Sequence, residues 1–441
     1  MSLADPLPVA PLDGPVDVTF PIPGSKSITN RALVCAALAD GRSTLRGVLH
    51  ADDTAAMVEG LGALGVPVED GPTDDAGPSL LVAGCHGRPP AELAIVDARQ
   101  SGTTGRFLLP VAALAAGTVR VDGALQLRAR PMGPSIDALR ALGATVVDIG
   151  APGHLPVEVS GGPVAGGRLR VPGSASSQFL SGLLLAAPAM RTGLTVEVEG
   201  DLVSRPYVDM TVAVMADFGV TVDRPDDATW HVEPQAYRAA EHLVEPDATA
   251  ASYAFALAVV TNGRVTVEGL GTRSLQGDVA FADVLERMGA RVERTATSIT
   301  VAGTGRLRGV EVDMADISDT AQTLAIVAAM AEGPTRITGI GFIRAKETDR
   351  IGAVVTELRR AGIDATEEPD GLVVRPGPVR PALIETYEDH RMAMSFALLG
   401  LRHPGIRIVD PGCVAKTFPG YWAVLDRLRA GDLPRSRVQP S

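Results

Sequence analysis

A pattern of small polar residues followed by long apolar stretches recurs along the chain. Six such clusters precede segments like FLSGLLLAAPAM and TLAIVAAMA, which are apolar on nearly every side. Helices of this composition are buried, and Ser, Thr or Asp at their starts are typical N-caps. The clusters recur about every 70 to 75 residues, and their anchor residues are Ser27, Ser101, Ser176, Asp247, Asp319 and Asp389.

A second, more amphipathic helix is predicted in each recurring unit, and it ends at a glycine. LGALGVPV and LERMGARV are two of these segments, and a glycine just past a helix is a typical C-cap. Runs such as LTVEVEGDL and RVTVEGL lie between the helices and have the composition of strands. The glycines predicted to end helices are Gly65, Gly143, Gly219, Gly289, Gly362 and, near the end of the chain, Gly431.

The periodicity predicts an α/β protein made of six copies of one mixed unit, three in each of two domains. A chain of 441 residues exceeds the size of one ordinary core. A solenoid used as a binding scaffold has the same kind of repetition. Against this alternative, buried helix N-termini carry unpaired amides and partial positive charge, so six of them facing one cleft would suit a multiply anionic ligand.

Composition narrows the class of protein further. The net charge of −12 disfavours a general nucleic-acid partner, and the odd set Cys35, Cys85 and Cys413 has neither metal-ligand spacing nor the look of a disulfide framework. The first residues show no basic segment followed by an apolar run, and no apolar stretch of ~20 residues predicts a membrane span. We therefore expect a soluble cytoplasmic protein.

Lysine is unusually rare in this chain. Of 40 basic residues only Lys26, Lys346 and Lys416 are lysines. An ammonium group is a compact charge with a shiftable pKa, whereas guanidinium is a permanent planar fork, so lysine is expected to persist where arginine cannot replace it. Compositional accident is the alternative. The chemical reading gains weight because all three lysines fall in polar motifs.

Four motifs concentrate charge at predicted helix starts or in loops. PIPGSKSITNR (21–31) lacks the second glycine of a Walker loop, but it puts a lysine and an arginine on an apolar helix, where each needs a partner. IRAKETDR (343–350) crowds two cations and a carboxylate at one predicted helix start, for which a surface salt-bridge cluster is the ordinary explanation. YEDHRMAMSFAL (387–398) opens a buried helix, and DPGCVAKTFPGYW (410–422) holds a lysine in a Gly/Pro loop.

Seven motifs in order resemble those of the 5-enolpyruvylshikimate-3-phosphate synthases, a family of enolpyruvyl transferases. They are PGSKSITNR, RARPMG, GSASSQFL, DLVSRPY, AKETDR, EDHRMAM and AKTFPGY, which extend from about residue 20 to residue 422. The resemblance implies an inside-out α/β fold with βαβαββ-like repeats, buried helices and outer sheets. It also implies a domain of residues 1–24 and 246–441, a second domain of residues 25–245, and an active site in the interdomain cleft.

The resemblance implies transfer of the enolpyruvyl group of phosphoenolpyruvate to the 5-hydroxyl of shikimate 3-phosphate, a step towards chorismate and the aromatic amino acids. Residues carried over for shikimate 3-phosphate are Lys26, Ser27, Arg31, Ser176, Ser177, Gln178, Ser204, Tyr207, Asp319 and Lys346. Residues carried over for phosphoenolpyruvate are Lys26, Gly102, Thr103, Arg130, Gln178, Arg350, His390, Arg391 and Lys416.

Three of these residues are expected to be catalytic. Asp319 begins a helix, so backbone amides are expected to fix its carboxylate as the base for the 5-hydroxyl. Glu347 is the expected proton donor to C3 of phosphoenolpyruvate and the later acceptor, although flanking cations favour its ionised form. Lys26 is expected to assist the departing phosphate. The reaction calls for no metal and no organic cofactor, and the family implies a monomer.

Some positions depart from the family pattern. The usual Asn-Ala-Gly-Thr stretch is Gln100-Ser101-Gly102-Thr103 here, which puts the Asn contact in doubt. Phe107 stands where proline is frequent, and Phe342 stands where asparagine is frequent. Because the first stretch lies in the phosphoenolpyruvate motif, sensitivity to glyphosate, an inhibitor of this family, does not follow from the sequence.

Three other functions remain open at this point. The sister transferase acting on UDP-N-acetylglucosamine usually has a Lys-Asn pair where this chain has Lys26-Ser27, and it carries a reactive cysteine that residues 110–130 lack. RNA 3′-terminal phosphate cyclases share related units but need a basic RNA surface, which the net charge of −12 disfavours. A non-catalytic scaffold of the same fold would have no reason to keep Asp319 and Glu347 with all three lysines.

Overall fold

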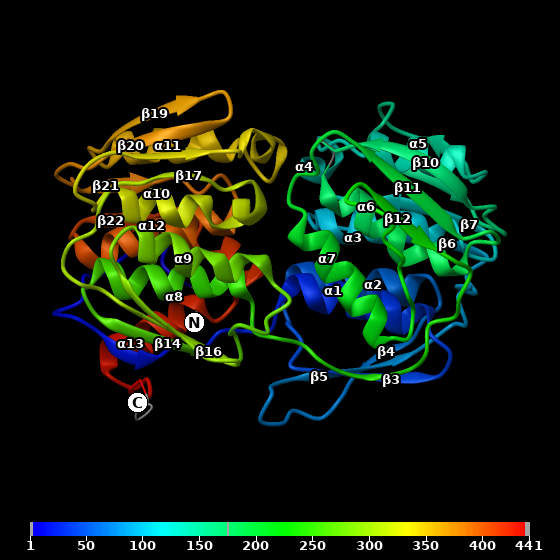
Figure 1. The fold of residues 1–441 in the computed structure, drawn as a ribbon, viewed down its shortest axis with the longest axis horizontal. Helices are drawn as coiled ribbons and strands as arrows, with labels where there is room; N and C mark the ends of the chain where they lie inside the picture. The colour runs from blue at the N-terminus through cyan, green and yellow to red at the C-terminus, as the bar shows by residue number, and fades with distance from the viewer. Residues whose placement is uncertain (1–2, 174–175, 437–441) are drawn as a thin grey trace. The chain divides into compact units, whose positions relative to one another are not determined.

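The computed structural model describes residues 3–173 and 176–436, and its chain divides into two compact units. One is discontinuous in sequence and comprises Met1–Pro23 and Pro246–Ser441, and the other is continuous and comprises Gly24–Glu245. Each unit has a hydrophobic core built from its own helices and strands (Figure 1). Two residues of the GSASSQFL motif, Ser174 and Ala175, lie outside the described residues, as do the chain ends 1–2 and 437–441.

The discontinuous unit has three buried helices at its centre. Every residue of α8 (Ala248–Val260) and α10 (Ala321–Ala328) is buried, and only the last residue of α12 (His390–Arg402) is exposed. Helices that are apolar all round must lie inside, so the sequence prediction of buried helices is confirmed here. The other helices of this unit are α9 (Phe281–Arg287), α11 (Arg350–Arg360) and α13 (Tyr421–Ala430).

The continuous unit repeats this arrangement. Its buried helices are α1 (Lys26–Leu38), α3 (Gly102–Ala112) and α6 (Ser177–Ala186), and the strands of the unit lie outside them (Figure 1). The remaining helices are α2 (Asp52–Ala63), α4 (Leu125–Arg128), α5 (Gly133–Ala141) and α7 (Pro206–Asp217).

Six sheets are formed within the described residues, three in each unit, and each combines one parallel strand pair with antiparallel partners. In one of them β14 is parallel to β2 and antiparallel to β16, with the buried Val265 opposite the buried Val301. The α/β class predicted from the sequence is therefore confirmed, whereas the count of six sequence repeats stays a prediction.

The strand orders of the sheets, with their bounds, are as follows. The discontinuous unit has β1 (Leu7–Pro8), β22 (Ile406–Ile408), β21 (Ala382–Ile384); β15 (Arg291–Arg294), β16 (Ser298–Ala302), β14 (Arg264–Glu268), β2 (Asp17–Thr19); and β17 (Glu311–Asp313), β18 (Thr335–Thr338), β20 (Gly371–Arg375), β19 (Asp364–Glu368). The continuous unit has β10 (Gly167–Pro172), β11 (Leu194–Glu199), β12 (Thr229–Val232); β13 (Glu241–Leu243), β3 (Arg42–Arg46), β5 (Ser79–Ala83), β4 (Val68–Asp70); and β6 (Leu93–Asp97), β7 (Thr118–Asp122), β9 (Val157–Ser160), β8 (Thr145–Asp148).

Most of the predicted helix ends are confirmed. Side chains of the predicted clusters accept hydrogen bonds from first-turn amides at five helix starts, namely those after Ser25, Ser101, Ser176, Asp247 and Asp389. The cap of α1 is Ser25, while the anchor Ser27 lies within the helix. The six predicted C-cap glycines all have positive φ angles, between 75° and 109°. A helix that ends with a residue in the left-handed conformation requires such an angle.

Candidate active site

Arg350 is the centre of a buried ionic cluster in the discontinuous unit. Its side chain is 2% exposed, and its three guanidinium nitrogens contact three carboxylates. The Nε atom lies 2.7 Å from Asp389 Oδ2, Nη1 lies 3.1 Å from Asp319 Oδ1, and Nη2 lies 2.7 Å from Glu347 Oε2. One planar cation therefore fixes three acidic side chains that come from three separate segments of the chain.

A second arginine completes this cluster. Arg391 Nη2 donates to Asp319 Oδ2 at 2.7 Å, so the Asp319 carboxylate is held by two guanidinium groups. Burial lowers the pKa of Arg350, but the carboxylates of Asp389, Glu347 and Asp319 outweigh this and raise it above its ordinary value. Arg350 therefore stays a cation. We call these five residues the Arg350 cluster.

The expected placement of Asp319 is wrong in one respect. Asp319 does not begin α10; it lies in a 3-10 helix (Ala315–Thr320), and Thr320 is the residue that precedes α10. Its carboxylate accepts from Arg350 and Arg391. Hydrogen bonds from a cation to a carboxylate are stronger than those from a neutral amide, which explains why the side chain turns towards the arginines.

The charges of the IRAKETDR motif lie at a helix start, as expected, and one other local expectation needs correction. Helix α11 begins at Arg350, and Lys346 and Glu347 lie just before its cap, Asp349. Lys346 Nζ is 6.0 Å from the centre of the Phe342 ring. Lys416 ends a 3-10 helix (Pro411–Lys416) instead of lying in an irregular loop, and it is 4% exposed. Pro411 and Gly412 are its first two residues, and proline is well suited to a helix start because its fixed φ matches the helix and its missing N–H is not needed there.

His390 is the first residue of α12 and is fully buried. Its Nδ1 atom lies 3.6 Å from Asp389 Oδ1, so it adjoins the Arg350 cluster. The cap residue Asp389 also accepts from the Arg391 backbone amide at 2.9 Å, which fixes the first turn of α12. Asp389, His390 and Arg391, which we call the DHR triplet, thus bring a carboxylate, an imidazole and a guanidinium to one buried helix start.

In the continuous unit, the first polar group is centred on the start of α1. Lys26 Nζ lies 3.2 Å from Asp53 Oδ2, and both side chains are largely buried. Arg31, one turn further on, is 1% exposed and donates to the backbone oxygens of Ser27 at 2.8 Å and Tyr207 at 3.0 Å. Burial lowers the pKa of Arg31 to about 10, so its guanidinium remains charged at neutral pH.

Gly102 begins α3 against two guanidinium groups. A Cβ atom placed on Gly102 would lie 2.8 Å from Arg130 Nη1 and 2.9 Å from Arg106 Nη1, closer than any real side chain tolerates. Arg106 Nη1 also donates to Gln178 Oε1 at 2.7 Å, and Gln178 Nε2 donates to Thr103 Oγ1 at 3.4 Å. Gly102, Thr103, Arg130 and Gln178 are therefore neighbours, joined through Arg106, and we call these five residues the Gly102 group.

The remaining predicted ligands lie at the starts of α6 and α7. Ser176 caps α6, Ser177 is the first residue of that helix, and Gln178 is the second. Ser204 is buried with φ 55°, a left-handed conformation that is costly for a residue with a side chain. Its backbone oxygen accepts from the amide of Tyr207, which lies in the first turn of α7. Tyr207 is joined to α1 through Arg31.

Sequence reasoning missed three residues of these groups. Asp53 was not singled out, although a lysine on a buried helix calls for an acidic partner. Asp389 was treated as an anchor and cap only, yet it holds Arg350 with two contacts of 2.7 and 3.3 Å. Arg106 was not singled out either, yet it binds Gln178 while its guanidinium lies 4.8 Å from the centre of the Phe179 ring. An apolar run interrupted by one arginine is the signal that could have identified Arg106.

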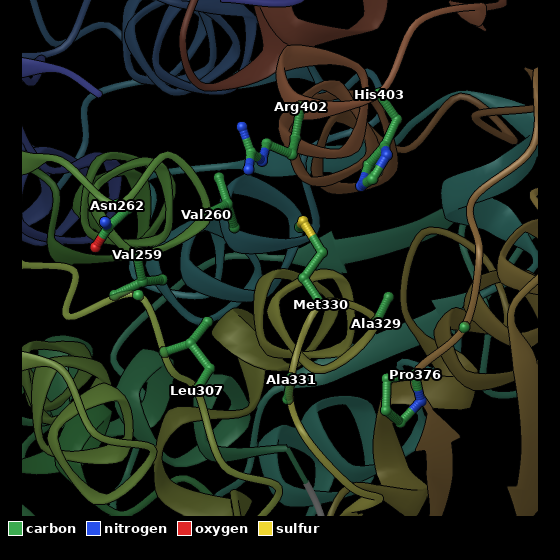
Figure 2. Close-up of a pocket in the computed structure, with 12 residues that line it drawn as sticks. Val259, Val260, Asn262, Leu307, Ala329, Met330, Ala331, Pro376, Arg402 and His403 are labelled. Carbon is green, nitrogen blue, oxygen red and sulfur yellow. The ribbon is translucent and has the colours of Figure 1, made fainter. Parts of the chain in front are cut away.

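A separate pocket of about 460 Å³ lies at the opposite ends of the buried helices in the discontinuous unit (Figure 2). Val260, Met330 and Arg402, at or just beyond the ends of α8, α10 and α12, line it together with His403. None of the predicted site residues lines this pocket. It is therefore distinct from the Arg350 cluster at the other end of α12.

The described part of the chain offers neither a metal-binding cluster nor a membrane-spanning helix. Over residues 3–173 and 176–436, no three His, Cys, Asp or Glu side chains are grouped so as to hold a metal ion. None of the helices described there has both the length and the apolar character of a bilayer span.

Two α/β units with buried helices and outer sheets are the fold that this chain shares with solved enolpyruvyl transferases. The enolpyruvyl transferase NikO from Streptomyces tendae has this fold, with a TM-score of 0.71 over 95% of this chain and 96% of its own at 21% identity. An EPSP synthase from Acinetobacter baumannii is more similar, with a TM-score of 0.79, 27% identity and coverage of 98% and 99%.

The family is shown by the sequence comparisons. The family model for EPSP synthase (3-phosphoshikimate 1-carboxyvinyltransferase) matches residues 9–425. A 3-phosphoshikimate 1-carboxyvinyltransferase from a Nostoc species is 46% identical over 419 residues, which are 95% of this chain and 98% of that protein. One from Methanoculleus marisnigri is 45% identical, over 93% and 97%. The chain belongs to the EPSP synthase family, as the seven motifs predict.

Proposed function

We propose that the chain transfers the enolpyruvyl group of phosphoenolpyruvate to the 5-hydroxyl of shikimate 3-phosphate and releases phosphate. The single observation that carries this proposal for the site is the Arg350 cluster, in which both expected proton-transfer carboxylates, Asp319 and Glu347, contact one buried guanidinium. Membership of the EPSP synthase family supports the choice of reaction.

The reaction needs a base, an acid and cationic ligands. Asp319 takes the proton of the 5-hydroxyl while the oxygen of that hydroxyl bonds to C2 of phosphoenolpyruvate. Glu347 gives a proton to C3, which becomes a methyl group. Glu347 then takes a proton back from that methyl group as the C2–O bond to phosphate breaks. The proton taken by Asp319 passes to the departing phosphate, which leaves as inorganic phosphate and restores the Asp319 carboxylate. Lys26 stabilises that phosphate by its charge, and an arginine fork suits carboxylate and phosphate recognition.

The substrate ligands are proposed by their chemistry. Phosphoenolpyruvate carries a carboxylate and a phosphate, and the groups proposed to bind it are Lys26, Gly102, Thr103, Arg130, Gln178, Arg350, His390, Arg391 and Lys416. Those proposed for shikimate 3-phosphate are Lys26, Ser27, Arg31, Ser176, Ser177, Gln178, Ser204, Tyr207, Asp319 and Lys346. The proximity of Gly102, Arg130 and Gln178 supports the first set. We also propose that the protein acts as a monomer in the cytoplasm, with small-molecule partners only.

The experiment that tests this function compares two acceptors. Phosphate release from phosphoenolpyruvate is followed with shikimate 3-phosphate and, in parallel, with UDP-N-acetylglucosamine, without added metal. We expect release with shikimate 3-phosphate alone. Release with UDP-N-acetylglucosamine alone would assign the chain to the sister reaction, and no release with either would contradict catalysis of this kind.

A further inference from the structure

The segment that leads into the DHR triplet makes a strained turn. Tyr387 and Glu388 follow one another with φ angles of 55° each, and the Asp389 amide donates to the Thr386 oxygen at 2.9 Å. Two successive left-handed central residues are the mark of a type I′ turn, which normally has Asn and Gly at these positions. A tyrosine and a glutamate there are strained, and such strain persists only where the surroundings hold the turn in place.

Glu357 forms the contacts that hold this turn in place. Its side chain is fully buried on α11, and each of its carboxylate oxygens accepts a hydrogen bond from the segment that carries the turn. Tyr387 Oη donates to Oε1 at 2.7 Å, and the Glu385 backbone amide donates to Oε2 at 3.1 Å. Arg360 Nε lies 3.4 Å from Oε2 and is the nearby cation.

Helix α11 therefore contacts the segment that carries the turn through two of its side chains. Glu357 lies seven residues after Arg350, two helical turns further on, so both side chains leave the same face of the helix. Arg350 binds Asp389 at the end of the turn, and Glu357 binds Tyr387 at its beginning. The turn ends in the cap of α12, and Arg391 follows two residues later.

We propose that Glu357 and Tyr387 are positioning residues for enolpyruvyl transfer, because their contact holds the strained turn that places Asp389 and Arg391 in the Arg350 cluster. This inference rests on the proposed function and adds to it two residues outside the proposed ligand sets. Neither residue touches substrate in this account. They act through Asp389, Arg350 and Arg391, and through those arginines on the binding of phosphoenolpyruvate.

Both contacts of Glu357 with the segment that carries the turn are hydrogen bonds in which its carboxylate oxygens accept. Burial raises the pKa of Glu357, while the hydrogen bonds from Tyr387 and from the Glu385 amide and the charge of Arg360 lower it, and the charge of Glu385 adds to the rise. An amide of the same shape offers one acceptor and one donor at the same two positions. Glutamine at position 357 can accept from the Glu385 amide and donate to the tyrosine hydroxyl oxygen.

The test measures the KM of each substrate and the melting temperature in three variants. Tyr387→Phe removes only the hydroxyl, and Glu357→Gln keeps the shape and hydrogen-bonding capacity of the carboxylate. Tyr421→Phe is the control, since it removes the hydroxyl of a fully buried tyrosine whose Oη donates at 2.9 Å to the Met394 oxygen of α12, away from the start of that helix. All three are compared with the wild-type chain in the phosphate-release assay.

We expect Tyr387→Phe to raise the KM for phosphoenolpyruvate about threefold to tenfold, the effect of losing one hydrogen bond, with the KM for shikimate 3-phosphate changed less than about twofold. Glu357→Gln and Tyr421→Phe are expected to keep both values near those of the wild type. Unchanged kinetics in Tyr387→Phe, or equal changes in Tyr387→Phe and Tyr421→Phe, would overturn the proposal. An inactive wild-type chain would refute the proposed function first, and this inference with it.

Discussion

Replacing Asp389 by asparagine tests how much the buried charge of the Arg350 cluster contributes. The Asp389 carboxylate is fully buried, and it contacts Arg350 at 2.7 and 3.3 Å while it caps α12 through the Arg391 amide. Asparagine caps a helix about as well as aspartate, so Asp389→Asn removes the charge and one of the contacts to Arg350 but keeps the cap. The variant therefore measures the contribution of the buried ion pair separately from that of the cap of α12.

The expected loss follows from these contacts. A hydrogen bond to a charged, buried group contributes about 1.5–3 kcal/mol, so we expect the free energy of unfolding to fall by about 2–3 kcal/mol. For a unit of roughly 200 residues this lowers the melting temperature by about 5–10 °C. The turnover number is expected to fall as well, because Arg350 loses a ligand that orients it towards Asp319 and Glu347.

Asp349→Asn is the matched control for this prediction. Asp349 caps α11 through the amides of Ile351 and Gly352 and pairs with Arg344 at 2.8 Å, but its side chain is 48% exposed. Exposed ion pairs contribute about 0.2–1 kcal/mol, so this variant should unfold within a few degrees of the wild type. Thermal unfolding followed by far-ultraviolet circular dichroism measures both. Equal losses in Asp389→Asn and Asp349→Asn would refute the argument from burial.

Two further predictions concern the Gly102 group and the cysteines. In Gly102→Ala the new methyl group would displace the guanidinium groups of Arg130 and Arg106, so we expect the KM for phosphoenolpyruvate to rise about tenfold. The melting temperature is expected to stay the same or rise, because alanine favours a helix more than glycine does. An unchanged KM would contradict this prediction. Burial raises the pKa of Cys85 to about 11, so at pH 8 its thiolate fraction is roughly one hundredfold below that of an ordinary thiol. Iodoacetamide should label Cys85 much faster in the unfolded chain than in the native one at pH 8, as mass spectrometry measures, and native labelling should speed up towards pH 11. Equal native and unfolded rates at pH 8 would contradict this.

Much of the local structure follows from the sequence because it depends on near neighbours. Ser101 and Asp247 were predicted as caps, and each accepts from an amide three residues on. Gly219 and Gly362 were predicted to end helices, and both have the left-handed φ angle that glycine adopts at low cost. Such features are decided within one helical turn, so composition and spacing are sufficient to predict them.

Contacts between distant segments were not predictable in the same way. Asp319 was expected to begin a helix, yet it lies in a 3-10 helix before α10, and its partners Arg350 and Arg391 come from helix starts 31 and 72 residues away. Lys26 and Asp53 pair across α1 and α2, and nothing local in either helix specifies this partner. Which carboxylate meets which cation depends on how the helices pack, and one sequence does not contain that information in a local pattern.

The left-handed turn before α12 illustrates a third limit. Tyr387 and Glu388 have no propensity for a type I′ turn, so local rules predict an ordinary extended segment there. The turn forms because Glu357, on another helix, provides hydrogen-bond partners for it. Departures of this kind from local rules are expected near functional sites.

The most direct test of the central claim is the rate of enolpyruvyl transfer by Asp319→Asn with shikimate 3-phosphate and phosphoenolpyruvate. In a single turnover followed by quenched flow, the wild-type chain should form 5-O-(1-carboxyvinyl)-3-phosphoshikimate. The variant should do so at least about a hundredfold more slowly, because a general base contributes about that much or more, with shikimate 3-phosphate binding within a few-fold of the wild type by calorimetry. A variant with the wild-type rate would contradict the role of Asp319 as the base.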